Sequence, residues 1–151
     1  MRTYPLLLLA SLSLAPAQPA PNGAALARYE KVDAAPARTS IHIGSALVAA
    51  GRFVRVNGVY SAAYTAKVSP FSFWSEKGTL RIAVSDEDLK RLSRGIPIEF
   101  KGGAIRSDGR ERLVEGRVTP LGPTTGQIKI RLIVNRYLVL VFTTTYRLPS
   151  G

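Results

Sequence analysis

The chain has 151 residues, no cysteine, and 21 Lys and Arg against 10 Asp and Glu, which gives a formal net charge of +11. This length fits one domain. The missing cysteine excludes disulfides, thiolate metal sites and a lipoprotein anchor. The positive charge favours anionic partners, but it also serves solubility alone and does not determine the fold.

Residues 1–17, MRTYPLLLLASLSLAPA, have the three parts of a secretion signal. These parts are a positively charged start, an apolar stretch and a cleavage site of small residues at Ala15-Pro16-Ala17. The apolar stretch is shorter than the roughly 20 residues of a membrane-spanning helix. We therefore expect a signal peptide over 1–17, and a periplasmic or extracellular protein with no stable membrane span after cleavage.

Residues 18–38 are rich in Ala and Pro and are predicted to form a flexible segment, because proline removes backbone donors and fixes φ. From residue 39 to residue 149, β-branched and aromatic residues rise and turn signals recur, which is typical of an antiparallel β domain. We expect about eight or nine short strands, in a β-sandwich or a small barrel. The pattern does not decide between these two architectures.

The first strands are predicted over 40–49 and on either side of Asn57-Gly58. Asn-Gly favours a type I′ turn, because both central residues need a positive φ. A two-residue loop there pairs Val56 with Val59. The aromatic segment 69–75 is then expected to form a short strand.

A strand over 79–85 places Leu80, Ile82 and Val84 on one face. One helix is predicted over 85–95, with Ser85 as its N-cap and Gly95 closing it. Its narrow apolar stripe suggests a lid on one end of the β structure.

A second hairpin is expected at Asp108-Gly109. Strict two-residue pairing puts Phe100 opposite Arg117, which places an apolar residue and a charge on one face. A bulge at Gly102 or Gly103 would move Phe100 opposite Val118, and glycine accepts the conformation that a bulge needs.

A third hairpin is expected at Asn135-Arg136. A two-residue turn sets Leu132 opposite Val139 and Ile130 opposite Val141 on the buried face. The strand over 137–146 is apolar on both sides, and we expect both sides to be covered.

No motif in the chain points to catalysis. His42 is the sole histidine and is expected on an exposed strand position without converging partners. The carboxylates are accounted for by the helix start and by charge-paired strand faces, and the glycines lack the spacing of a phosphate loop. We therefore predict a non-enzymatic domain with no metal and no cofactor.

Two groups of residues could bind a partner. Tyr60, Tyr64 and Trp74 could stack on sugar rings if they are exposed, while Phe71 and Phe73 are expected in the core. The position of Trp74 stays open. The second group is cationic and is predicted on outward strand positions, where it could form a basic face: Arg112, Arg117, Lys129 and Arg131.

The sequence thus favours an exported binding or structural module of the cell envelope. Its partner would be an anionic envelope polysaccharide or a membrane surface, and not nucleic acid. The alternative is a carrier of a small apolar ligand, which a closed barrel with an apolar cavity would favour. The sequence leaves the oligomeric state open.

Overall fold

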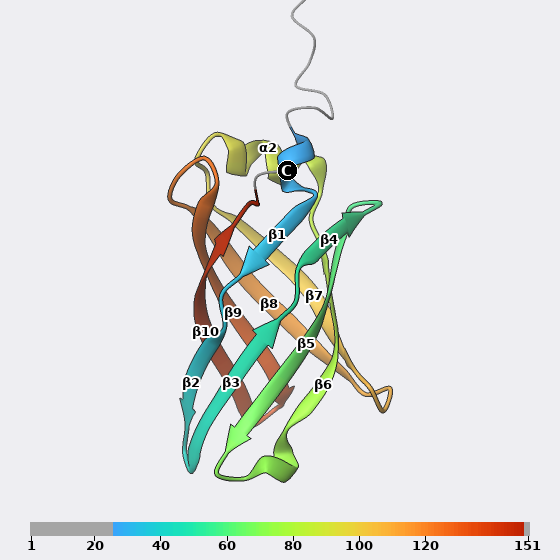
Figure 1. The fold of residues 1–151 in the computed structure, drawn as a ribbon, viewed down its shortest axis with the longest axis vertical. Helices are drawn as coiled ribbons and strands as arrows, with labels where there is room; N and C mark the ends of the chain where they lie inside the picture. The colour runs from blue at the N-terminus through green and yellow to red at the C-terminus, as the bar shows by residue number, and fades with distance from the viewer. Residues whose placement is uncertain (1–25, 150–151) are drawn as a thin grey trace, which may run out of the picture.

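The computed structural model describes residues 26–149, and they form an antiparallel β-barrel with one α-helix across one end (Figure 1). The fold class is as predicted, and the barrel is the architecture adopted. The strands in chain order are β1 (Lys31–Ala34), β2 (Ala37–Ile41), β3 (Gly44–Ala50), β4 (Phe53–Val56), β5 (Val59–Ser69), β6 (Glu76–Ala83), β7 (Ile98–Arg106), β8 (Glu111–Pro120), β9 (Thr125–Asn135) and β10 (Leu138–Arg147).

Eight strands close the barrel in a ring. Consecutive strands from β4 to β10 pair as antiparallel neighbours, and β1 pairs with both β4 and β10. The hairpin of β2 and β3 extends the wall on the side of β5. Closure leaves none of the eight ring strands as a sheet edge, whereas β2 pairs with β3 alone.

The barrel begins earlier in the chain than expected. Tyr29 is buried in the core, and all of β1 and the first two residues of β2 fall within the segment 18–38 that was predicted to be flexible. That prediction is wrong over residues 27–38, because a short strand of Lys31–Ala34 before Pro36 carries little local β signal. The predicted signal peptide, 1–17, lies outside the described residues.

The first hairpin is confirmed in detail. Asn57 and Gly58 have φ values of 51° and 79°, and Val56 lies opposite Val59. Two neighbouring expectations are wrong. The segment 40–49 is interrupted by a turn at His42 and Ile43 between β2 and β3, and 69–75 contains a 3₁₀ helix, η2 (Ser72–Trp74), in place of a strand.

The second hairpin has no bulge at Gly102 or Gly103, where the ladder between β7 and β8 is regular. The extra residue lies in the turn instead, which is a loop of three residues, 107–109. The amide of Arg106 donates to the carbonyl of Arg110 across this loop, and Gly109 at its end has a φ of +89°. Phe100 therefore faces Gly116, and not Val118. Three-residue hairpin loops commonly place glycine at this left-handed position.

The third hairpin differs from the prediction by one residue, so Ile130 faces Phe142 and Leu132 faces Leu140. Phe142 points into the barrel, while Val139 and Val141 are about two-fifths exposed on the outside. The Asn135 side chain accepts hydrogen bonds from two backbone amides in the turn, and the register shifts between Leu138 and Val139. The expected cover on both sides of this strand is therefore wrong for the described residues.

The helix is α2 (Asp86–Ser93), and it closes one end of the barrel. Ser85 caps it as predicted, accepting a hydrogen bond of 3.2 Å from the amide of Asp88. Leu89 and Leu92 are buried against the barrel core, and Gly95 follows with a φ of +80°. The apolar stripe of a short helix is thus enough to cover the end of the barrel.

Candidate ligand cavity and its polar layer

The interior of the barrel contains a cavity of about 130 Å³. Its wall is apolar, and every strand around the ring contributes to it. The largest lining side chains are aromatic or branched, and small alanines keep space open between them. Representative lining residues are Phe53, Leu80, Phe100, Ala104, Phe142 and Tyr146.

Two of the hydroxyl groups along this wall are hydrogen-bonded within the protein itself. The Tyr60 hydroxyl donates to the carbonyl of Tyr29, and the Thr144 hydroxyl donates to the carbonyl of Ala35. Burial raises the pKa of Tyr60, so this ring stays neutral. Because these donors are already used, the wall presents mainly hydrocarbon to the cavity.

The helix end of the cavity is held shut by an arginine from β4. One Arg55 nitrogen donates to the carbonyl of Val84 at 2.7 Å and to the Asp86 carboxylate at 2.8 Å. These bonds tie the strand to the first turn of α2. Leu89 and Leu92 then lie directly over the apolar interior.

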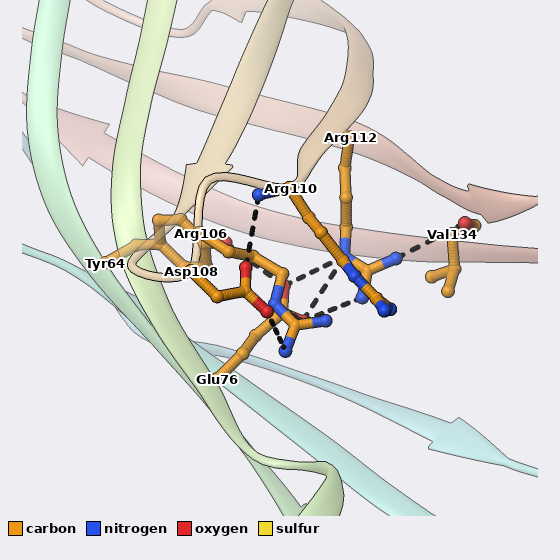
Figure 2. Close-up of polar contacts among 7 residues, drawn as sticks. All are labelled: Tyr64, Glu76, Arg106, Asp108, Arg110, Arg112 and Val134. Atoms are coloured by element: carbon orange, nitrogen blue, oxygen red, sulfur yellow. Dashed lines mark hydrogen bonds and ion pairs between the residues drawn. The ribbon is translucent and has the colours of Figure 1, made fainter.

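At the opposite end, a polar layer occupies inward positions of the four neighbouring strands β5 to β8 (Figure 2). The Glu76 carboxylate accepts from Arg112 Nη2 at 2.9 Å and from Nε at 3.0 Å. Arg106 Nε lies 3.5 Å from the same carboxylate, and the Tyr64 hydroxyl donates to it at 3.0 Å. The Glu76 side chain is only 9% exposed, so this ion pair is almost fully enclosed.

The polar layer is balanced in charge. Arg106 also pairs with Asp108 at 3.2 Å, so two guanidinium groups face two carboxylates. Arg112 further donates to the carbonyl of Val134 at 3.3 Å. Burial, reinforced by the charge of Glu76, raises the pKa of Tyr64 to about 12. These groups provide one another with the partners that enclosed charges need.

The residues proposed from the sequence do not form one site. Tyr60 and Tyr64 line the cavity, whereas Trp74 is 49% exposed on η2. Phe73, expected in the core, is 73% exposed beside it. The sequence pattern predicted a strand at 69–75, but the 3₁₀ turn directs these rings away from the barrel interior.

The four cations proposed as a basic face are divided by the barrel wall. The outward position predicted for Arg112 is wrong, because Arg112 shares the inward face of β8 with Val114. Arg117, Lys129 and Arg131 do point outward, and Arg117 lies opposite Lys129 in the register.

Acidic residues interrupt the outer cations. Glu99 lies opposite Arg117, and Glu115 lies 3.7 Å from Arg131. The basic face is thus smaller and more mixed in charge than the sequence suggested.

Sequence reasoning missed Glu76 as the partner that Arg112 and Arg106 share. The alternation of side chains along a strand carried part of the signal. Glu76 lies on the same face of β6 as Leu80 and Ile82, and Arg112 lies on the same face of β8 as Val114. Alternation alone does not show that three strands bring these charges to the same end of the barrel.

Comparison of the chain with protein-family models, with curated proteins and with solved structures found no match. In the part of the chain that the structure describes, no helix is both long enough and apolar enough to cross a membrane. The cavity and the surface chemistry are therefore the basis for a functional proposal.

Proposed function

We propose that this domain carries a small, uncharged, apolar molecule inside its barrel. The observation that supports this is the closed wall with an apolar cavity of about 130 Å³. Concave, mostly apolar cavities are the usual binding sites of small molecules. As the sequence suggested, the domain would act in binding, after export.

The size of the cavity limits the ligand. An apolar cavity of about 150 Å³ in another protein stays dry and binds benzene or xenon. The cavity here is of similar size, so it suits a single ring or a short alkyl chain. Each methylene group buried there would contribute about 0.8 kcal/mol to binding.

The charges inside the barrel argue against an anionic ligand. Arg112 and Arg106 already face Glu76 and Asp108, and neither arginine is among the cavity-lining residues. A carboxylate ligand would have to break an enclosed ion pair, which is costly when one partner loses its counter-charge. A neutral ligand requires no such exchange.

Xenon and benzene test the proposal directly with the full-length protein. We expect both to raise the melting temperature in a saturable manner, because a ligand that binds only the folded state stabilises it. Ala104→Leu fills the cavity from a fully buried wall position and should abolish the shift. Ala63→Leu, on the exposed outer face of β5, is the matched control and should keep it.

If Ala104→Leu does not fold, Ala50→Leu is a second filling variant, since Ala50 also lines the cavity and is half-buried. An equal shift in the filled variant and the control would exclude the cavity as the site. So would the absence of any shift in the wild-type protein with either probe.

A second candidate function rests on Arg117 and Lys129, which lie opposite each other on the outer surface of β8 and β9. Two adjacent cations could hold an anionic envelope polysaccharide, as proposed from the sequence. Titration with such polymers across a salt series tests this, with Lys129→Glu expected to weaken binding. Binding that ignores both salt and Lys129→Glu would contradict it.

A further inference from the structure

The end of the barrel opposite α2 carries an exposed group of apolar side chains. Phe71, Phe73 and Trp74 pack together on and beside η2 in edge-to-face and tilted arrangements, with ring centroids 5.7, 5.0 and 5.4 Å apart. Phe73 is 73% exposed and Trp74 is 49% exposed. Strand β6 separates η2 from α2, so this group lies at the far end from the lid (Figure 1).

A second exposed apolar residue lies on the neighbouring turn. Ile43, in the turn between β2 and β3, is 49% exposed. The next residue, Gly44, lies so close to the carbonyl of Ser69 and to Pro70 that a Cβ atom would clash with them. The turn therefore packs against the start of the segment that leads to η2. We call Ile43, Phe71, Phe73 and Trp74 the aromatic tip.

The strands behind the aromatic tip are positively charged on their outer surface. Arg38 and Lys67 are exposed and both lie opposite Leu47 in the register of β2, β3 and β5. Lys77 is exposed at the start of β6. Within residues 37–49 and 64–79 the sole carboxylate is Glu76, and it is enclosed with Arg112.

We infer that the aromatic tip docks on the surface of an anionic lipid bilayer. Aromatic side chains prefer the membrane–water interface, and nearby lysines and arginines are attracted to anionic lipids. Lys67 lies two residues from the end of β5, which corresponds to about 7 Å along a strand. Lys67 therefore lies near the tip end of β5, where its charge can reach anionic headgroups.

The composition of the tip and its surroundings fits a membrane surface. The rings contact one another, and their charged neighbours are cations. Large exposed apolar patches mark interaction sites on soluble domains. The charge of the flanking strands selects an anionic surface.

Trp74 is the only tryptophan in the chain, so its fluorescence reports on the tip alone. The full-length protein is mixed with vesicles of equal parts phosphatidylcholine and phosphatidylglycerol. We expect the Trp74 emission to shift to the blue and to be quenched by brominated phosphatidylcholine in the same vesicles. With pure phosphatidylcholine vesicles the response should be much weaker, because the cations lose their partners.

Three variants test whether the aromatic tip is the surface that contacts the vesicles. Phe73→Ser keeps the Trp74 reporter and should weaken vesicle binding at least tenfold, and the double variant Lys67→Glu/Lys77→Glu should do the same on anionic vesicles. Leu121→Ser changes a residue that is 70% exposed at the other end of the barrel and should bind as the wild-type protein does. The wild-type protein and all variants have the same N-terminal sequence, so any contribution of that sequence to vesicle binding is the same in each.

Quenching of Trp74 that is lost in Phe73→Ser and kept in Leu121→Ser would support docking by the aromatic tip. Binding to vesicles without quenching of Trp74 would overturn the inference, because another part of the chain would then make the contact. Loss of binding in Lys129→Glu with full binding in Phe73→Ser would also overturn it, in favour of the outer basic face.

Discussion

The ring of Phe100 lies across Gly116 on the neighbouring strand, inside the barrel. A Cβ atom on Gly116 would stand 2.4 Å from Cζ of Phe100 and 2.5 Å from the carbonyl oxygen of Lys129. Tyr146 covers Gly126 in the same manner, with a Cβ atom 2.3 Å from Cε1. These glycines let aromatic rings lie against the inner wall, and the wall of the cavity depends on that fit.

Gly116→Ala should destabilise the protein by about 2 kcal/mol, because overpacking forces side chains and backbone to shift. The Lys129 carbonyl belongs to the ladder and cannot move away. Gly103→Ala is the control on the same pair of strands, since its Cβ would meet only the Arg112 carbonyl at 3.7 Å. Urea unfolding measures both, and equal stability of the two variants would contradict the role of Gly116.

Glu76→Gln should lower the free energy of unfolding by about 3 kcal/mol near neutral pH, since it leaves Arg112 enclosed without its counter-charge. Asp108→Asn removes a carboxylate that is 48% exposed and should cost well under about 1 kcal/mol. Chemical denaturation at neutral pH compares them. A Glu76→Gln protein as stable as Asp108→Asn would show that the polar layer tolerates an unpaired arginine.

Stability should fall at alkaline pH through the buried tyrosines. Burial raises the pKa of Tyr64 to about 12, whereas a tyrosine in an unfolded chain titrates near 10. Between these two values the unfolded chain loses its proton first. The stabilisation from Tyr64 is therefore complete below about pH 10 and is lost as the pH rises towards about 12, a change of about 3 kcal/mol.

Unfolding experiments at several pH values test this directly. Tyr64→Phe removes the titrating group, so its stability should fall less steeply than that of the wild-type protein over this range. Burial also raises the pKa values of Tyr60 and Tyr146, so the stability of the variant should still fall with pH, but less steeply. Identical slopes in the two proteins would contradict a raised pKa at Tyr64.

The lid should loosen when its cap is removed. Ser85→Ala deletes the hydrogen bond to the Asp88 amide and should cost about 1 kcal/mol. Hydrogen exchange of the α2 amides should become faster while that of β8 and β9 changes little. Ser93→Ala, at the exposed end of the same helix, is the control and should leave exchange near the wild-type rate.

Features that depend on a few adjacent residues were predictable. The turn at Asn57-Gly58 and the cap at Ser85 follow from the conformations that those residues accept. The inward row of Leu80, Ile82 and Val84 follows from strand alternation. In each case the relevant interactions span only a few positions along the chain.

Strand register was harder to predict where both faces of a strand are apolar. Val139 and Phe142 are equally acceptable as inward residues from the pattern alone. A one-residue slip reverses every side chain in such a strand. The larger ring was placed inside by the turn at Asn135 and by the space left within the barrel.

The sequence by itself determined a mostly β domain with a capped lid helix, because turn chemistry and alternation act locally. Only the tertiary structure decided that the sheet closes, since Ala34, near the start of the domain in sequence, pairs with Tyr146, near its end. Closure also surrounds the cavity, and the register of β6, β7 and β8 brings Glu76 to Arg112 across the strand between them. Such contacts depend on how many strands complete the ring and how they tilt, which no short segment encodes.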